Sequence, residues 1–304
     1  MVIRSPSLCL ILDRLPAHLP LFSSNKRHSV YQTRYRATAL KFSPEHDVPR
    51  PVSNRLTHII QWSIALILLY SIPSTQAADL HIAVATNFNR TAAALARSFE
   101  QQNKHTVRLV FGSTGKHFAQ ITHGAPFEVF FAADERRPAL LEKNGLAVPG
   151  TRFTYAQGRL VLWSPDAERV DTKGDVLING DFRKLAIANP KLAPYGFAAR
   201  EILQAHGLWK KLQPRLVRGE NIGQTYQFIR TGNAQLGFIA AAQIFTDGNL
   251  PDTGSYWVPP QALYTPVIQQ AVLIKDTPAA RAFIRFVKSD IARKIIQQHG
   301  YDTP

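Results

Sequence analysis

Short apolar runs alternate along this chain with stretches of helical periodicity, and four of the junctions between them share one composition. At each junction the apolar run ends in small, amide-bearing or hydroxyl-bearing residues, and a helical pattern begins there. The runs cover residues 80–85, 107–111, 185–188 and, less clearly, 216–217. Because strands that alternate with helices form mostly parallel sheets covered on both faces, the pattern predicts an α/β fold.

The spacing of apolar residues also places the helices. Apolar residues at i, i+3, i+4 and i+7, with glycine or capping signals at the ends, predict helices at 90–102, 116–123, 197–206 and 222–231. Two more helices are expected at the C-terminal end, and the Gly- and Pro-rich residues 246–262 are expected to form a surface loop. Residues expected to face inward are Ala92, Leu95, Ala96, Phe99, Phe118, Ile121, Ile291, Ile295 and Ile296.

Two extended runs rich in β-forming residues, 154–163 and 265–274, are expected to cross between two lobes. We therefore expect lobe 1 to comprise residues 78–155 and 266–304, and lobe 2 to comprise residues 156–265. Ligands of open α/β sheets bind beyond the carboxyl ends of the strands. The four junctions, two in each lobe, therefore predict a ligand cleft between the lobes.

The N-terminal part of the chain has the features of a secretory signal. Two arginines precede the 14-residue, mostly apolar run 59–72, and small residues follow it. We predict a signal peptide at 52–77 that is cleaved after Ala77; an uncleaved N-terminal anchor is the alternative. Residues 1–51 show no sustained periodicity, so our hypothesis is that translation starts near Val52 and that this segment is an artefact of the gene model. A genuine disordered extension is the alternative.

Charge and cysteine content narrow the function further. The 304-residue chain has a formal net charge of +15, and residues 78–304 hold 27 of its 36 Lys and Arg and 18 of its 21 Asp and Glu, a net charge of +9. A basic protein suits an anionic ligand and an acidic docking partner. Nucleic acid is not expected as a partner, since no recognition motif is visible. The single cysteine, Cys9, precedes the predicted cleavage site, so the mature protein has no disulfide and no cysteine nucleophile.

The four junctions predict a site for a small anion. A helix N-terminus presents unpaired N–H groups and a partial positive charge, and several that converge in one cleft can bind an anion. Each junction alone has the composition of an ordinary helix cap, so it is the recurrence at strand ends that favours a site. The candidate ligand-binding residues, which offer hydroxyl, amide or backbone N–H donors, are Thr86, Asn87, Ser113, Thr114, Tyr195 and Ile222.

The chemistry of these donors bears on which anion would bind. The junctions hold few carboxylates, and only Glu220 is close to one of them. A site made of donors favours a fully ionised dianion such as sulfate, molybdate or tungstate, whereas protonated phosphate needs an acceptor. Asn87 can accept through its side-chain carbonyl, so phosphate remains an alternative.

Catalytic motifs are missing from the chain. The sequence Gly112-Ser113-Thr114-Gly115 does not match the nucleophile elbow of hydrolases. Neither the phosphate-binding P-loop nor the dinucleotide fingerprint is present, and the histidines have no metal-ligand spacing. We therefore expect no enzyme activity, no cofactor and no direct metal ligands.

These motifs carry a resemblance to a known family. Residues 79–302 resemble the periplasmic molybdate-binding proteins of ABC transporters, which have the type II fold of two lobes, each a mostly parallel sheet flanked by helices. The motifs are Ala85-Thr86-Asn87-Phe88, Gly112-Ser113-Thr114-Gly115, Gly124-Ala125-Pro126-Phe127, Ala133-Asp134, Asn189-Pro190, Pro194-Tyr195-Gly196 and Gly237-Phe238-Ile239-Ala240.

The resemblance implies a function as well as a fold. It implies that molybdate or tungstate is bound as an intact oxyanion by Thr86, Asn87, Thr114, Tyr195 and Ile222, with Ser113 beside them. It also implies a soluble, monomeric periplasmic receptor without a cofactor, which delivers the anion to an inner-membrane ABC permease. A sensor or interaction module, or a receptor for sulfate or phosphate, is the alternative.

The chain departs from many members of that family in one respect. Many have Ala-Ser after the first strand and a tyrosine soon after the strand that matches 236–240, where this chain has Thr86-Asn87 and Ala241-Ala242. It resembles the subgroup in which the tyrosine comes from the position of Tyr195. This departure leaves the preference between molybdate and tungstate open.

Overall fold

The computed structural model describes residues 79–304, apart from 247, 251 and 252. The predicted extension at 1–51, the signal peptide at 52–77, the cleavage after Ala77 and Cys9 lie outside the described residues. None of the helices in the described part of the chain is long and apolar enough to cross a lipid bilayer.

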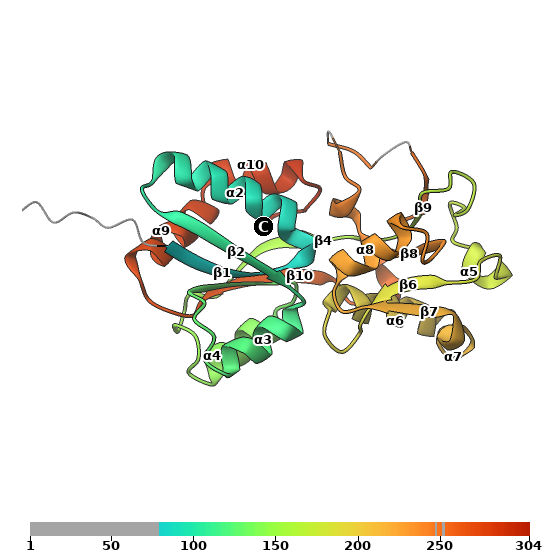
Figure 1. The fold of residues 1–304 in the computed structure, drawn as a ribbon, viewed down its shortest axis with the longest axis horizontal. Helices are drawn as coiled ribbons and strands as arrows, with labels where there is room; N and C mark the ends of the chain where they lie inside the picture. Colours follow the sequence, from blue (N-terminus) through green and yellow to red (C-terminus); the bar gives the residue numbers. More distant parts are fainter. Residues whose placement is uncertain (1–78, 247, 251–252) are drawn as a thin grey trace, which may run out of the picture. The chain divides into compact units, whose positions relative to one another are not determined.

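The described residues form two five-stranded sheets, and the first has the strand order β2-β1-β3-β10-β4. Figure 1 shows its strands β1 and β2 side by side. In this sheet β1, β2 and β3 are parallel, whereas β10 is antiparallel to both of its neighbours. Alternate side chains of the central strands pack against α2, α9 and α10 on one face and against α3 and α4 on the other. The elements are β1 (Asp79–Ala85), α2 (Asn89–Gln102), β2 (Thr106–Gly112), α3 (Thr114–Thr122), β3 (Val129–Ala132), α4 (Arg136–Lys143), β4 (Phe153–Gly158), β10 (Val267–Leu273), α9 (Pro278–Val287) and α10 (Asp290–Gln298).

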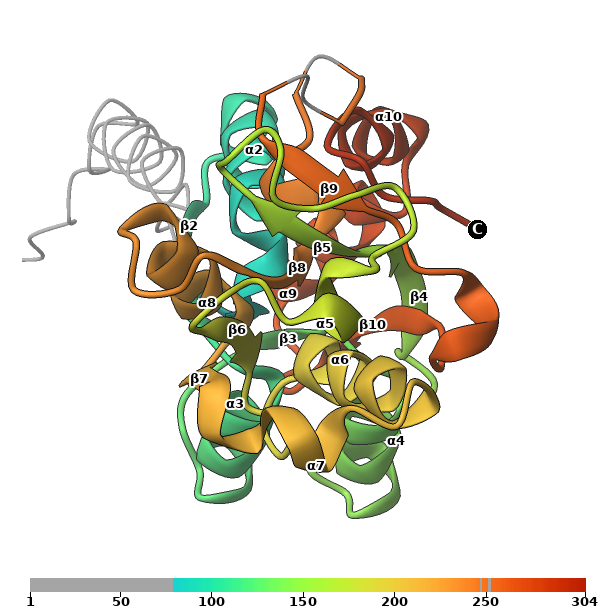
Figure 2. The same cartoon turned by 90° about the vertical axis from the view of Figure 1, so that its right-hand side faces the viewer.

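The second sheet repeats this plan, with the order β7-β6-β8-β5-β9 (Figure 2). Its strands β6, β7 and β8 are parallel, and β5 is antiparallel to β8 and β9. One face packs against α5, α6 and α7, and the other packs against α8. The elements are β5 (Leu160–Ser164), α5 (Val176–Asn179), β6 (Leu185–Ala188), α6 (Pro194–Ala205), α7 (Trp209–Leu212), β7 (Leu216–Gly219), α8 (Ile222–Arg230), β8 (Leu236–Ala240) and β9 (Ser255–Trp257). Short 3-10 turns are η1 (Thr86–Phe88), η2 (Gln213–Arg215), η3 (Ala241–Gln243) and η4 (Gln261–Leu263).

The predicted α/β fold class with two mostly parallel sheets is confirmed, but the crossing between the sheets differs from the expectation. The run 154–163 is not one strand: β4 belongs to the first sheet and β5 to the second, with Arg159 between them. The second run forms β10, which pairs only within the first sheet. The chain therefore crosses through two connections that lie outside the ladders. The division into lobes at 78–155 with 266–304 and at 156–265 stays a prediction, and β4 (Phe153–Gly158) runs past its boundary at 155.

Two local expectations are wrong. Residues 246–262 are not entirely loop, because β9 lies among them and pairs Tyr256 and Trp257 with β5. The ring of Trp257 is buried against the second sheet, which stabilises a strand that its Gly- and Pro-rich flanks concealed. In α10, Ile296 is buried but Ile291 is 52% exposed, since the buried stripe of this helix runs through Ala292.

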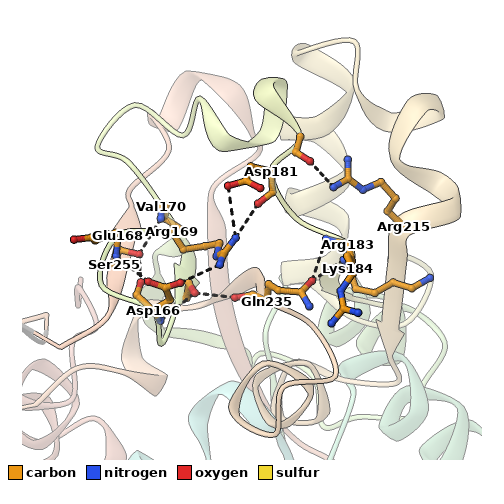
Figure 3. A network of polar contacts seen from close by, with 12 residues as sticks. Asp166, Glu168, Arg169, Val170, Asp181, Arg183, Lys184, Arg215, Gln235 and Ser255 are labelled. Atoms are coloured by element: carbon orange, nitrogen blue, oxygen red, sulfur yellow. Dashed lines mark hydrogen bonds and ion pairs between the residues drawn. The ribbon is translucent and has the colours of Figure 1, made fainter.

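A polar network anchors the long connection after β5 (Figure 3). Ser255 of β9 donates to the carbonyl of Asp166 and accepts the N–H of Val170 at 2.9 Å. The side-chain oxygen of Gln235 accepts the backbone N–H groups of Arg183 and Lys184 at 3.1 and 2.8 Å. These bonds satisfy backbone groups of an irregular segment that no strand could pair. The network lies in the second sheet, apart from the junctions at the strand ends.

Candidate anion-binding site

The structure brings all six candidate residues together around one small cavity between the two sheets. Two junctions of the first sheet, after β1 and β2, meet two junctions of the second sheet, after β6 and β7. Each candidate residue is at most 8% exposed, so the cavity is shielded from bulk water. The lining residues are Ala85, Thr86, Asn87, Gly112, Ser113, Thr114, Ala133, Ala193, Pro194, Tyr195, Asn221 and Ile222.

The junction after β2 presents two hydroxyl groups. Ser113 caps α3, and its Oγ accepts the N–H of Lys116 at 3.3 Å. Thr114 Oγ1 accepts the buried N–H of Ala133 at 3.0 Å. In both bonds the hydroxyl is the acceptor, so its own hydrogen remains available for a ligand.

The junctions of the second sheet present helix N-termini. The 12-residue α6 begins at Pro194, and the 9-residue α8 begins at Ile222 after a cap in which Asn221 Oδ1 accepts the N–H of Gln224 at 2.9 Å. The backbone N–H groups of Tyr195 and Ile222 therefore lie in first helical turns, where no carbonyl of the same helix can accept them. Partial positive charge gathers at such positions and favours an anion.

Direct hydrogen bonds hold the two sheets together around the cavity. Thr86 Oγ1 accepts the N–H of Gly223 at 3.2 Å and donates to Asn221 Oδ1 at 3.3 Å. On the other side, the N–H of Gly115 donates to the carbonyl of Leu192 at 2.8 Å. Thr86 thus links the lobes in this conformation as well as lining the cavity.

The side-chain amide of Asn87, which the sequence suggested as a donor to the anion, is used within the protein instead. Its side-chain Nδ2 donates to Gln269 Oε1 at 2.6 Å and to the Tyr301 hydroxyl at 3.2 Å. An amide nitrogen has two hydrogens, so both are committed within the protein. What Asn87 retains for an anion is its backbone N–H.

Gln269 and Tyr301 were missed by sequence reasoning, and both contact candidate residues. They lie 182 and 214 positions from Asn87, and neither belongs to a junction. A signal was nevertheless present for one of them, because Gln269 and Gln270 interrupt an otherwise apolar strand. A polar residue that is buried in a strand usually has a specific partner.

The electrostatics of the cavity favour neutral donors. Burial raises the pKa of the Tyr195 phenol well above its usual value, so the hydroxyl keeps its proton. Burial also lowers the pKa of His117 behind the site, and this ring bonds the carbonyl of Val84 through Nε2 at 3.2 Å. No carboxylate lines the cavity in the described part of the chain. Glu220, the acid nearest to a junction, pairs with Lys116 at 3.1 Å, and both of these side chains are largely exposed.

The described residues around the cavity offer hydrogen-bond donors. Within residues 79–304, as far as they are described, no three His, Cys, Asp or Glu side chains come together as potential metal ligands. Converging N–H and O–H groups can instead hold a small anion in a buried space. Two α/β sheets that close such a space between their strand ends form the architecture of a two-lobed receptor for a small ligand.

Comparisons with known proteins agree with this architecture. Residues 80–302 match the family model described as bacterial extracellular solute-binding protein. The chain is 47% identical to the molybdate-binding protein ModA of Azotobacter vinelandii over 231 residues, which are 75% of this chain and 91% of the relative. It is 45% identical to ModA of Rhodobacter capsulatus over 244 residues, which are 79% of this chain and 94% of the relative.

A solved structure extends the match to three dimensions. The periplasmic molybdate-binding protein of Azotobacter vinelandii superposes with a TM-score of 0.71 at 43% identity, covering 74% of this chain and 99% of that one. The chain therefore belongs to the family of bacterial extracellular solute-binding proteins that includes these molybdate-binding proteins. Its relatives are binding proteins and not enzymes, as the missing catalytic motifs predicted.

Proposed function

We propose that this protein is the periplasmic substrate-binding component of an ABC importer and that its ligand is molybdate. The observation that carries the proposal is the convergence of buried, uncharged donors from both sheets on one cavity, whose lining among residues 79–304, as far as they are described, holds no carboxylate. The two molybdate-binding relatives, at 47% and 45% identity, support the choice of anion.

The proposed ligand groups are those whose hydrogens stay available. They are the hydroxyls of Ser113, Thr114 and Tyr195 and the backbone N–H groups of Asn87 and Ile222, with Thr86 beside them. Each hydrogen bond to a charged group contributes about 1.5–3 kcal/mol. Five such bonds amount to roughly 8–15 kcal/mol before the costs of closure and ordering, which is consistent with micromolar to nanomolar affinity.

Tungstate is proposed as a second ligand. A tetrahedral oxyanion with the same charge meets the same donors, and nothing in a set of N–H and O–H groups distinguishes the central atom. Hydrogen phosphate carries a proton that needs an acceptor, and the cavity offers no carboxylate for it. Sulfate satisfies the same donors but is smaller, so we expect the size of the anion-bound cavity to distinguish it from molybdate.

The proposed transport cycle uses the two lobes, residues 78–155 with 266–304 and residues 156–265. The open receptor captures the dianion, and the connections between the sheets act as the hinge while both lobes donate to it. The closed monomer then docks on the inner-membrane permease and releases the anion for import. Export of the receptor to the periplasm would require the predicted signal at 52–77.

The test is calorimetric titration of protein purified from the periplasm of an expressing bacterium. We expect tight one-to-one binding of molybdate and tungstate and far weaker binding of sulfate and phosphate. Mass spectrometry of the same sample should give an N-terminus at residue 78. The absence of binding to all four anions would refute the receptor, and tight binding of sulfate alone would refute the choice of anion.

A further inference from the structure

A buried chain of polar side chains connects strand β10 with the candidate site. Gln269 is fully buried in this strand, whereas Asn87 and Tyr195 come from junctions of the first and second sheets. Gln269 Oε1 accepts from Asn87 Nδ2 at 2.6 Å, and Gln269 Nε2 donates to the Tyr195 hydroxyl at 3.5 Å. One glutamine therefore contacts ligand candidates of both sheets.

The direction of these hydrogen bonds follows from one backbone carbonyl. The Tyr301 hydroxyl has a single hydrogen and donates it to the carbonyl of Asn87 at 2.7 Å. The Tyr301 oxygen must then accept a hydrogen bond from the Asn87 side chain, so the Asn87 atom that faces it is Nδ2. The second hydrogen of that nitrogen points to Gln269, so the oxygen of Gln269 faces Asn87 and its nitrogen faces Tyr195.

A second contact is consistent with the same orientation of Gln269. The Tyr155 hydroxyl lies 3.1 Å from Gln269 Oε1 and donates toward it or toward the carbonyl of Ala132, also at 3.1 Å. The ladder between β4 and β10 shifts register between Gln269 and Gln270, which leaves Tyr155 without a paired position. Such an irregularity turns a side chain out of its regular alternation.

The orientation of Gln269 determines where the hydrogen of the Tyr195 phenol can point. Because Gln269 Nε2 donates to its oxygen at 3.5 Å, the phenol hydrogen has to point elsewhere, and Tyr195 lines the cavity. A Cβ atom at position 158 would collide with the phenol oxygen, so glycine leaves the space that the hydroxyl occupies. Burial raises the pKa of Tyr155, Tyr195 and Tyr301 alike, so all three hydroxyls keep their hydrogens.

We propose that Gln269 is a positioning residue that, with Tyr301 and Asn87, fixes the direction of this hydrogen-bond chain and thereby aims the Tyr195 hydroxyl hydrogen at the bound anion. The inference rests on the proposed oxyanion-binding function and adds a specificity determinant to it. Gln269 does not touch the anion: it ensures that Tyr195 meets it as a donor. The site then favours a fully ionised anion, since no lone pair of the phenol is directed at the ligand.

The test is a double-mutant cycle on molybdate affinity, measured by calorimetry with the full chain as expressed and processed. The variants are Gln269→Met, Tyr195→Phe and the double variant, and Gln270→Met is the matched control. Gln270 is the next residue of the same strand and is also buried, but it bonds Arg152, Glu135 and Thr154, away from the cavity. Thermal unfolding of each anion-free variant reports its stability separately.

We expect Gln269→Met to raise the Kd about tenfold, the size of a hydrogen bond to a charged group. In the Tyr195→Phe background the same change should alter the Kd less than about twofold, because the hydroxyl on which Gln269 acts is gone. Gln270→Met should bind with the wild-type Kd even if it lowers the melting temperature. A merely structural role of Gln269 would move the melting temperature but would not produce this coupling.

Other outcomes overturn the inference. Equal affinities of the Gln269→Met and Gln270→Met variants would remove Gln269 from any positioning role, and additive losses would show that it acts independently of Tyr195. If Gln269→Met fails to fold, Tyr301→Phe serves in its place, because it removes the hydroxyl at which the hydrogen-bond chain begins. Its effect on the Kd should likewise disappear in the Tyr195→Phe background. A wild-type protein that binds no molybdate would refute the proposed function itself, a result distinct from normal binding without coupling.

Discussion

Replacing Thr114 by valine tests the site at a position where one hydroxyl has two separable roles. Valine keeps the shape of the side chain and removes the oxygen, which lies in a residue that is only 1% exposed. That oxygen accepts the N–H of Ala133 at 3.0 Å, and in the proposed complex its hydrogen goes to the anion. The substitution should therefore affect stability without ligand and affinity with it.

The two effects have different expected sizes. Leaving the buried N–H of Ala133 without an acceptor costs about 1–3 kcal/mol of unfolding free energy. Losing a hydrogen bond to a charged ligand costs about 1.5–3 kcal/mol of binding free energy, which is about a 10- to 150-fold rise in Kd. At a molybdate concentration that gives the wild type about 4 kcal/mol of ligand stabilisation, a variant with 100-fold weaker binding would gain only about 1.4 kcal/mol.

The assay combines urea unfolding without anion, calorimetric titration with molybdate, and Thr114→Ser as the matched control that keeps the oxygen. Serine should stay close to the wild type in both measurements. A wild-type Kd for the valine variant would exclude the Thr114 hydroxyl from the ligand set. An unchanged unfolding free energy would show that the bond to Ala133 contributes nothing, and the argument from burial would fail.

Three further predictions follow from the contacts. Gly158→Ala should displace the Tyr195 phenol, because the added Cβ would collide with its oxygen. It should weaken molybdate binding at least tenfold and lower the unfolding free energy by about 1–3 kcal/mol, and a normal Kd in titration would contradict this collision. Burial lowers the pKa of His117 from its ordinary 6.5, so the unfolded chain binds more protons than the folded one as the pH falls below that value. The contribution of neutral, buried His117 to the unfolding free energy is therefore present above about pH 6.5 and is lost as the pH falls. His117→Gln should flatten this dependence in urea unfolding at about pH 7.5 and 5.5, and an unchanged slope would exclude His117 as its source. Ser255→Ala should leave the buried N–H of Val170 unpaired and cost about 1–3 kcal/mol of stability without changing the Kd, since its network lies away from the cavity (Figure 3).

Features that depend on neighbouring residues could be predicted from the sequence. The helix at 222–231 appears as α8 (Ile222–Arg230), begins after its Asn221 cap, and buries an apolar stripe. The buried residues Leu95 and Phe99 of α2 follow the same rule. Period, caps and breakers act within one or two turns, so these elements can be read from a short window of the chain.

Features that depend on distant partners could not be predicted in this way. The strand β9 forms because β5 offers an edge on which Trp257 can be buried, although the Gly- and Pro-rich residues on either side of it look like loop. Ile291 is exposed because α10 is oriented by its contacts with the first sheet, while its sequence alone allowed a wider apolar face. In both cases packing outweighed a local signal.

The candidate site shows the same division. The residues that could donate hydrogen bonds were predictable from the sequence, because strand ends followed by helix starts are local patterns. All six candidate residues line one cavity. Which of their hydrogens remain available depends on contacts between residues that are far apart in the sequence. The Asn87 amide is committed to Gln269 and Tyr301, which are 182 and 214 residues away. The physical reason is that a donor is defined by its residue type, whereas its direction is set by whichever acceptor the folded chain brings within about 3 Å.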